Sequence, residues 1–175
     1  MRRLSLNARM AIDPVSSDEI FVLLMEFAHP DLEDGPIRLS TDNAERISED
    51  PLIYGTRSTW RGADPVSQPF LWIVASALLP SDQEDTPAAA QIVLENLDSE
   101  MVAVLRSFRT PATVNMAVVL ADTPDLIEAE YLDLQLVSAE ISDGEIQLSI
   151  SRDEIELEPF PPARMTRDRF PGLHL

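Results

Sequence analysis

The chain contains no cysteine and no lysine among its 175 residues, and it has only five glycines and two histidines. Because cysteine is absent, disulfide bonds, thiolate metal ligands and a cysteine nucleophile are excluded, and synthesis inside a cell is expected. The glycines stand singly, which excludes a glycine-rich phosphate-binding loop. His29 and His174 lie far apart in the sequence, so a Ser-His-Asp arrangement is not expected.

Long apolar runs are also missing. No run approaches the roughly 18–20 residues that a membrane-spanning helix needs. Residues 1–10 are basic but contain neither the apolar stretch nor the cleavage site of a secretory signal. We therefore expect neither membrane insertion nor export by such a signal.

Patterns typical of catalysis or metal binding are weak. Residues 31–35 (DLEDG) resemble a calcium loop only faintly, because the spacing differs and the closing glutamate is out of register. Carboxylate pairs such as Glu128 and Glu130 lie on predicted strands without a nearby histidine, which is weak support for hydrolysis. The sequence predicts no catalytic residue, no cofactor and no metal site, and hence a protein that is not an enzyme.

Charge is abundant and unevenly distributed. The net charge is −18. Residues 1–9 carry +3, residues 159–175 carry +2, and the body between them therefore carries −23. An acidic body repels phosphate, so sequence-specific nucleic-acid binding is not expected, although the body can face nucleic acid as a repelling wall. The basic ends suit acidic surfaces of neighbouring subunits.

All thirteen cations are arginines. Arginine pairs with carboxylates through two hydrogen bonds and is enriched at interfaces, where lysine is depleted. An arginine bias of a GC-rich genome explains the same composition equally well. Both explanations stay open at this point.

The middle of the chain predicts a strand–helix–strand unit. Gln91–Leu97 alternates as a strand does, Met101–Arg109 carries an apolar stripe at helical spacing, and Ala112–Leu120 alternates again. Asp98 is suited to cap the helix, and Thr110-Pro111 ends it. Such a short helix must pack on a sheet, so its stripe is interpreted as core.

The remaining pattern is mainly β. Ile20–Phe27 is expected as a strand buried on both faces, and Thr41–Pro51 as a loop or a poorly ordered segment. In Leu126–Ile141 the apolar parity changes by one residue, which predicts a β-bulge near Val137. The other expected elements are a helix at Leu4–Ile12 capped by Ser5 or Asn7, strands at Ile37–Leu39, Leu52–Trp60 (with Gly55 at a kink or bulge), Phe70–Ala77 and Glu145–Ile150, and a hairpin turn at Asp143-Gly144.

Both ends of the chain are candidates for contacts with partners. The organisation predicted is an N-terminal arm and helix (1–14), a β domain (15–158) and an extended C-terminal arm (159–175). Pro159–Pro162 is stiff and extended, and the segment after it is basic with exposed apolar residues. The candidate docking residues are Arg2, Arg3, Arg164, Arg167, Arg169, Phe170 and Leu173, and the candidate row of outward acids is Glu154, Glu156 and Glu158.

Several motifs occur in an order that resembles a known family. They are a strand and turn at Ile20–Leu32 (IFVLLMEFAHPDL), a helix start at Asn96–Glu100 (NLDSE), a turn at Val119–Asp125 (VLADTPD) and a terminal Phe170–Leu173 (FPGL). The chain resembles small minor tail proteins of tailed phages and prophages, similar to the protein that caps the tail tube in lambda-type phages. The long acidic connectors depart from the family pattern.

The resemblance implies a fold and a function. The fold expected is an antiparallel β-sandwich or barrel of the tail-tube type with one short packed helix. The function expected is a structural ring in the virion, at the distal tail tip, that joins the tail tube to the central hub and encloses the DNA channel. A homohexamer is expected, with a trimer as the alternative, and Glu154, Glu156 and Glu158 facing the lumen. The competing hypotheses are a tail assembly factor that is absent from the mature particle and a cell-wall hydrolase at the tip.

Overall fold

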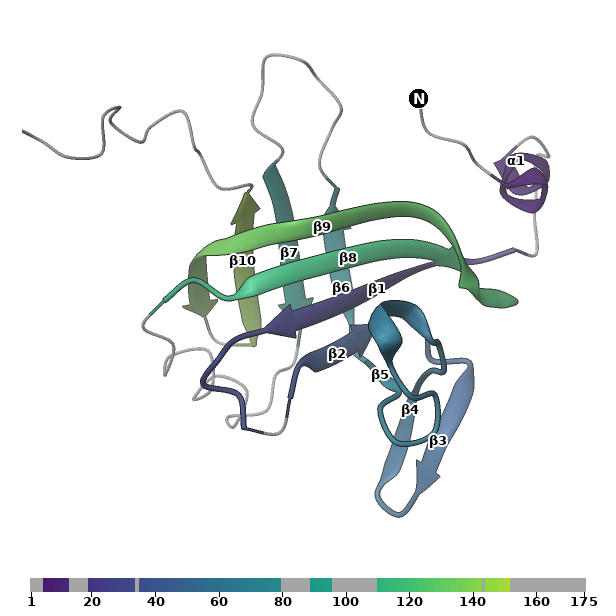
Figure 1. Cartoon of the computed structure of the whole chain (residues 1–175), viewed down its shortest axis with the longest axis horizontal. Coiled ribbons are helices and arrows are strands. Elements are labelled where there is room, and N and C mark those ends of the chain that lie inside the picture. The colour runs from purple at the N-terminus through teal and green to yellow at the C-terminus, as the bar shows by residue number, and fades with distance from the viewer. Residues whose placement is uncertain are drawn as a thin grey trace, which may run out of the picture.

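The computed structural model describes residues 5–12, 19–33, 35–79, 89–95, 110–142 and 144–151. These residues form one short α-helix, a 3₁₀ turn and ten strands in a single mixed sheet (Figure 1). The predicted mainly-β architecture is confirmed. The sheet is not closed, so it is not a complete barrel.

The strands follow one another in the sheet in the order β3-β4-β5-β2-β1-β8-β9-β10-β7-β6. All neighbours are antiparallel except β2 and β5, which are parallel. The elements are α1 (Leu6–Ile12), β1 (Phe21–Ala28), β2 (Ile37–Ser40), β3 (Glu45–Glu49), β4 (Leu52–Thr56), the 3₁₀ turn η1 (Trp60–Gly62), β5 (Phe70–Trp72), β6 (Ala75–Leu78), β7 (Ala89–Glu95), β8 (Thr113–Leu120), β9 (Thr123–Ser142) and β10 (Glu145–Ser151).

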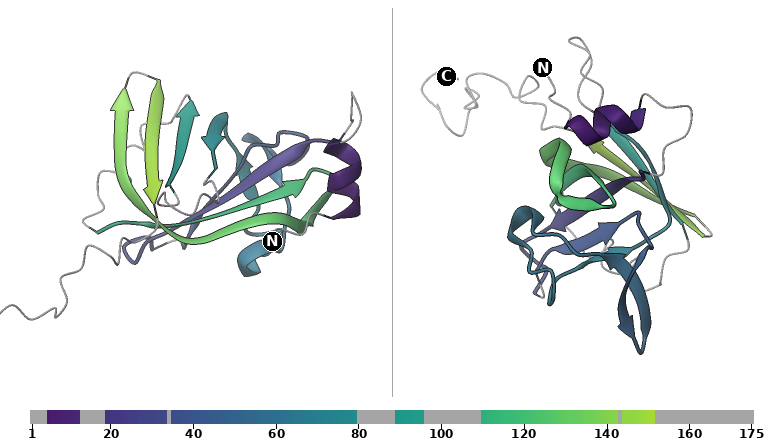
Figure 2. Two further views of the ribbon diagram at one scale, coloured as in Figure 1. Left: turned by 90° about the horizontal axis from the view of Figure 1, so that it is seen from above. Right: turned by 90° about the vertical axis from the view of Figure 1, so that its right-hand side faces the viewer.

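Strand β9 bends the sheet over on itself. Its first part pairs with β8 and its last part with β10, and Gln135 is the residue at which the two ladders meet. Val137 is skipped in the β9–β10 register, so the predicted bulge is confirmed there. The bend carries β10, β7 and β6 across β8 and β1 (Figure 2). A twenty-residue strand therefore serves two halves of one sheet.

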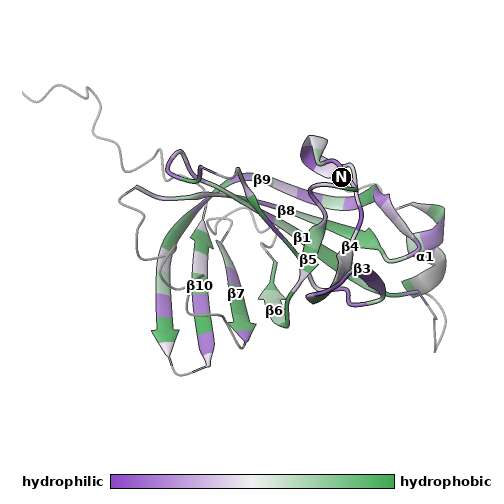
Figure 3. Ribbon diagram, turned by 90° about the horizontal axis from the view of Figure 1, so that it is seen from below, coloured by the Kyte–Doolittle hydropathy of each residue, from purple (hydrophilic) through white to green (hydrophobic). Residues whose placement is uncertain are grey.

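The main core fills the space between these halves. Alternate residues of β1 face it, namely Leu23, Met25 and Phe27. Strands β7 and β10 oppose them with alternating apolar side chains (Figure 3), among them Ile92 and Leu148, which are fully buried. Each such side chain contributes about 1.5–3 kcal/mol of transfer free energy. The alternation of β10 predicted from sequence is confirmed by its burial pattern.

A smaller core lies on the other face of the same sheet. The remaining β1 residues Val22 and Leu24 contact it, and the segment after β4 covers them with Trp60 and Phe70. Both faces of β1 are therefore buried, as the unbroken apolar run predicted. The Trp60 and Phe70 rings lie 5.8 Å apart between centroids.

The segment predicted as one strand, Phe70–Ala77, is divided into β5 and β6. The Ile73 N–H donates to the Ser40 carbonyl (2.9 Å), whereas the carbonyl of the next residue, Val74, accepts from the Glu95 N–H (2.9 Å). Ile73 and Val74, which are consecutive, thus bond to β2 and to β7, which belong to different halves of the sheet. The prediction of one continuous strand was wrong because the strand changes partners at this point.

Two further predictions in this region were wrong. Thr41–Pro51 contains β3, a strand that hairpins with β4 but exposes most of its side chains, so no apolar alternation marks it. Gly55 does not mark a kink or a bulge. A Cβ atom at Gly55 would lie 2.1 Å from the Phe70 carbonyl oxygen, so glycine is needed for close approach of two backbones.

The N-terminal helix begins with the cap that was expected. The Ser5 hydroxyl accepts from the Ala8 N–H (3.1 Å), and the Ser5 N–H donates to Glu128 Oε2 on β9 (2.8 Å). Strands β7 and β8 confirm the two strands of the predicted central unit. The helix predicted between them, Met101–Arg109, lies outside the described residues. The β9–β10 hairpin is confirmed at Gly144, whose φ of 95° suits glycine.

Candidate functional site

The site residues predicted from the sequence lie outside the part of the chain that the structure describes. They are Arg2, Arg3, Glu154, Glu156, Glu158, Arg164, Arg167, Arg169, Phe170 and Leu173. Their roles stay predictions. The described residues instead present an acidic surface, a buried polar network and an apolar opening in the sheet.

The described residues are strongly acidic. They include seventeen aspartates and glutamates and five arginines, a net charge of −12. Four of these arginines already pair with carboxylates: Arg38 and Arg61 with Glu26, Arg46 with Glu49, and Arg57 with Glu45. Most of the carboxylates therefore have no arginine partner within the described part. A surface of this charge favours cationic partners.

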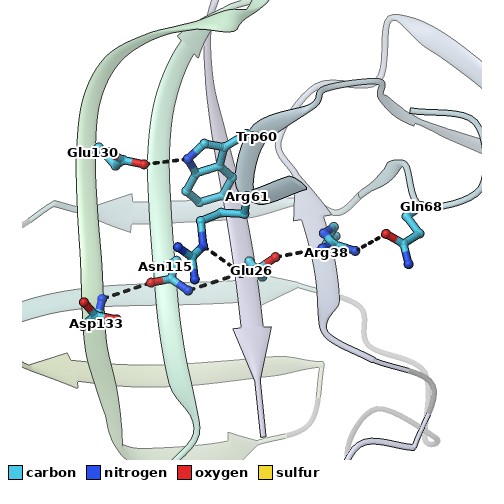
Figure 4. A network of polar contacts seen from close by, with 8 residues as sticks. All are labelled: Glu26, Arg38, Trp60, Arg61, Gln68, Asn115, Glu130 and Asp133. Atoms are coloured by element: carbon cyan, nitrogen blue, oxygen red, sulfur yellow. Dashed lines mark hydrogen bonds and ion pairs between the residues drawn. The ribbon is translucent and has the colours of Figure 1, made fainter. Parts of the chain in front are cut away.

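Glu26 is the charged residue at the centre of the buried network (Figure 4). It lies on β1, on the face of the smaller core, and is 4% exposed. Its Oε2 lies 3.0 Å from Nη2 of Arg38, and its Oε1 accepts from Nε of Arg61 (3.2 Å) and from Nδ2 of Asn115 (3.3 Å). A buried carboxylate requires such partners, because desolvation of an unpaired charge costs several kcal/mol.

The network holds the segment 57–68 against the sheet. Trp60 Nε1 donates to Glu130 Oε1 on β9 (2.8 Å), and Arg38 Nη1 donates to Gln68 Oε1 (3.1 Å). The Asn115 side-chain oxygen accepts from the N–H of Asp133, a residue of β9 with φ of 54°. Contacts from β1, β2 and β9 thus converge on one segment, and Asn115 on β8 links Glu26 to β9.

Asp125 fastens the start of the same segment. Its Oδ1 accepts from the Thr59 N–H (2.7 Å), the Thr59 hydroxyl (2.9 Å) and the Ser58 hydroxyl (3.1 Å). These hydrogen bonds, above all the one from the Thr59 backbone, lower the pKa of Asp125 below its ordinary value, against a smaller opposing effect of burial. The carboxylate is therefore ionised wherever the protein is folded near neutral pH.

His29 and Glu26 both form hydrogen bonds to neighbouring residues within the fold. His29 accepts from the Asp31 N–H at Nδ1 (3.1 Å), and its Nε2 bonds the Thr110 hydroxyl (2.8 Å), so both ring nitrogens are engaged. No group of three or more histidines and carboxylates placed to hold a metal ion occurs among the described residues. Both oxygens of the Glu26 carboxylate are likewise paired.

The apolar opening lies between the edge strand β6 and the beginning of β1, where β1 extends beyond its pairing with β2. We call it the seam. A pocket of about 180 Å³ occupies it, lined by Phe21, Val22, Leu23, Thr41, Ala77, Leu79 and Val118. Leu78 and Ile20 beside it are 70% and 60% exposed. Sequence reasoning missed the seam, because apolar residues of β6 look like ordinary core and only the strand order makes β6 an edge.

The comparisons with known proteins name no family for this chain. No protein-family model matches it, and no curated protein matches it. Within the described residues, no helix is long and apolar enough to cross a bilayer. The functional proposal therefore depends on the fold, the charge and the motifs of the sequence.

Proposed function

We propose that the chain is a structural subunit of a long-tailed phage, forming a ring at the distal tail that joins the tail tube to the hub and encloses the DNA channel. The observation that carries the proposal is the charge of the folded sheet: seventeen carboxylates and five arginines in the described residues. The order of the tail-protein motifs at residues 20–32, 96–100, 119–125 and 170–173 supports it.

The physical task of such a ring is to let DNA pass without binding it. DNA carries one negative charge per roughly 1.7 Å of its axis, and arginine or lysine contacts would retain it. An acidic wall repels the phosphates, so the DNA stays centred in the channel. The predicted lumen residues Glu154, Glu156 and Glu158 would add to this wall.

A ring also needs surfaces that join copies. The sheet of the described residues has two edges, β3 and β6, and both ends of the chain are basic while the body is acidic. Complementary charge of this kind orients subunits and neighbouring proteins as they meet. The proposed assembly is a homohexamer, or a trimer that matches the hub.

The test is the location of the chain in purified particles. We expect an epitope-tagged chain to be found by immunogold electron microscopy at the distal end of the tail, and deletion of its gene to stop tail assembly. If deletion stops assembly but mass spectrometry finds no chain in mature particles, the chain is an assembly factor. Normal infectious particles without the chain would overturn both assignments. Cell-wall hydrolysis by the purified protein in a zymogram would instead assign it an enzymatic role.

A further inference from the structure

Within the described part of the chain, the two edges of the sheet differ: β3 is protected against pairing with another strand, and β6 is open. Strand β3 has the sequence ERISE, and its charged residues Glu45 and Glu49 form ion pairs with Arg57 and Arg46. Charged side chains of this kind oppose pairing with another strand. Strand β6 has the sequence ASAL, without charge or proline, and Leu78 on it is 70% exposed.

Directly beyond the β6 edge lies the pocket of the seam, which suits an apolar side chain. Thr41 is its one polar lining residue, and the Thr41 hydroxyl already accepts from the Leu23 N–H (3.0 Å). Its volume of about 180 Å³ is comparable to apolar cavities of roughly 150 Å³ that bind benzene. The pocket therefore has room for one aromatic ring.

The chain itself contains a segment with matching chemistry. Residues 164–175 (RMTRDRFPGLHL) combine three arginines and one aspartate with Phe170 and Leu173. The described residues, which carry −12, attract a segment that carries +2. An apolar residue inside a basic segment thus fits an apolar pocket on an acidic body.

The place where the chain leaves the sheet permits this contact. Ser151 pairs with Ala89 on β7, and on the other side of β7 Leu78 pairs with Gln91. The end of β10 and the end of β6 are therefore at the same end of the sheet, two strands or about 10 Å apart. Phe170 follows Ser151 by nineteen residues, a reach of up to about 60 Å. The prolines of Pro159–Pro162 predict a stiff, extended spacer, which favours contact of the segment after it with another molecule.

We propose that the seam is a docking site for the C-terminal segment 164–175 of a second copy of this chain, with Phe170 in the pocket and the segment alongside β6. In this contact the C-terminal segment of one copy binds the seam of the next, which is a head-to-tail arrangement. Each copy therefore contributes its segment to one neighbour and its seam to another. Repetition of such a contact closes a ring when the rotation between copies allows it. This inference rests on the proposed function only in that copies must associate.

Two substitutions and a control test the inference in the full-length chain. Leu79→Asp places a charge at the pocket, Phe170→Asp removes the inserted ring, and Leu52→Asp makes the same change at a residue of β4 that is 60% exposed. Sedimentation velocity over a range of concentrations measures association. We expect the first two variants to associate at least tenfold more weakly than the unchanged chain, and the Leu52 variant to associate equally well. Circular dichroism checks that each variant is folded.

Mixing the two weakened variants gives the sharper test. The Leu79→Asp chain retains an intact segment 164–175, and the Phe170→Asp chain retains an intact seam, so one good contact is possible between them. We expect a one-to-one heterodimer in the mixture and none in either variant alone. A mixture that stays monomeric, with both variants folded, overturns the proposal.

A synthetic peptide of residues 164–175 identifies the occupant. We expect the labelled peptide to bind the full-length Phe170→Asp, Leu173→Asp variant in fluorescence anisotropy, and to lose binding when Leu79→Asp is added. If the unchanged chain is monomeric at every concentration while the peptide binds this variant, the segment docks on its own chain and the second-copy assignment is wrong. If the chain associates normally with Leu79→Asp, the docking site is wrong, while the proposed ring stands.

Discussion

Glu26 is the residue whose replacement most directly tests the packing of the smaller core. Its carboxylate is 4% exposed and lies within 3.3 Å of donor atoms of Arg38, Arg61 and Asn115. Glu26→Ala removes the carboxylate but leaves the Arg38 side chain, which is 9% exposed, without its ion-pair partner. Arg61 is 41% exposed and can turn to water. The cost therefore falls mainly on the buried Arg38 guanidinium, with a smaller part from the buried Asn115 amide, which loses its acceptor.

The expected loss follows from this geometry. Removal of one partner of a buried ion pair costs about 3–5 kcal/mol in the free energy of unfolding. Glu49→Ala is the matched control, because Glu49 also pairs with an arginine (2.7 Å) but both side chains are more than half exposed. Exposed pairs contribute about 0–1 kcal/mol. The predicted difference between the two variants is thus at least about 2 kcal/mol.

Urea unfolding monitored by far-ultraviolet circular dichroism measures both values. A third variant, Glu26→Met with Arg38→Met, removes both charges and should recover most of the loss, since a buried pair replaced by apolar residues is often neutral. If Glu26→Ala is no more destabilising than Glu49→Ala, the carboxylate does not hold the network. If the double replacement is as unstable as Glu26→Ala, the unpaired Arg38 is not the cause.

Two further predictions concern the segment 57–68 and its neighbour β5. The folded state lowers the pKa of Asp125, so its ionised carboxylate stabilises the folded protein fully at pH values above the ordinary pKa of 3.8, and this stabilisation is lost as the pH falls through the lower pKa of the folded state. Asp125→Asn should therefore reduce the free energy of unfolding by about 1 kcal/mol at pH 7, and its difference from the unchanged chain should shrink below pH 3.8. Trp60 fluorescence in a Trp72→Phe background follows the unfolding. Equal losses at pH 7 and pH 3 would contradict this. Gly55→Ala should destabilise by about 1–3 kcal/mol in urea unfolding, since the new methyl meets the Phe70 carbonyl, and unchanged stability would show that β4 and β5 can separate freely.

Much of the strand structure could be predicted because it depends on neighbouring residues. The parity change that predicted a bulge at Val137 is a property of one strand, and the structure places the skipped residue there. The apolar run at residues 20–27, which shows little alternation, predicted a strand buried on both faces, and β1 confirms it. Ser5 as a helix cap was likewise local. In each case the feature depends only on residues within a short stretch of the sequence.

Other features could not be predicted because distant residues decide them. Strand β3 is stabilised by backbone hydrogen bonds to β4, which leave no mark on its polar sequence. Glu26 stands out as a charge in an apolar run, yet its partner Asn115 is 89 residues away. The function of the chain ends and of the predicted lumen acids stays a prediction, since those residues lie outside the described part.

The sequence by itself determined the β character of the chain, the parity of buried side chains along strands such as β10, and the strong negative charge of the body. These follow from composition and from the two-residue repeat of a strand, which needs no knowledge of partners. Only the tertiary structure decided which strands are neighbours, and therefore that β6 is an edge beside an open seam. Strand pairing is settled by long-range backbone hydrogen bonds, and every backbone offers the same donors and acceptors whatever its side chains.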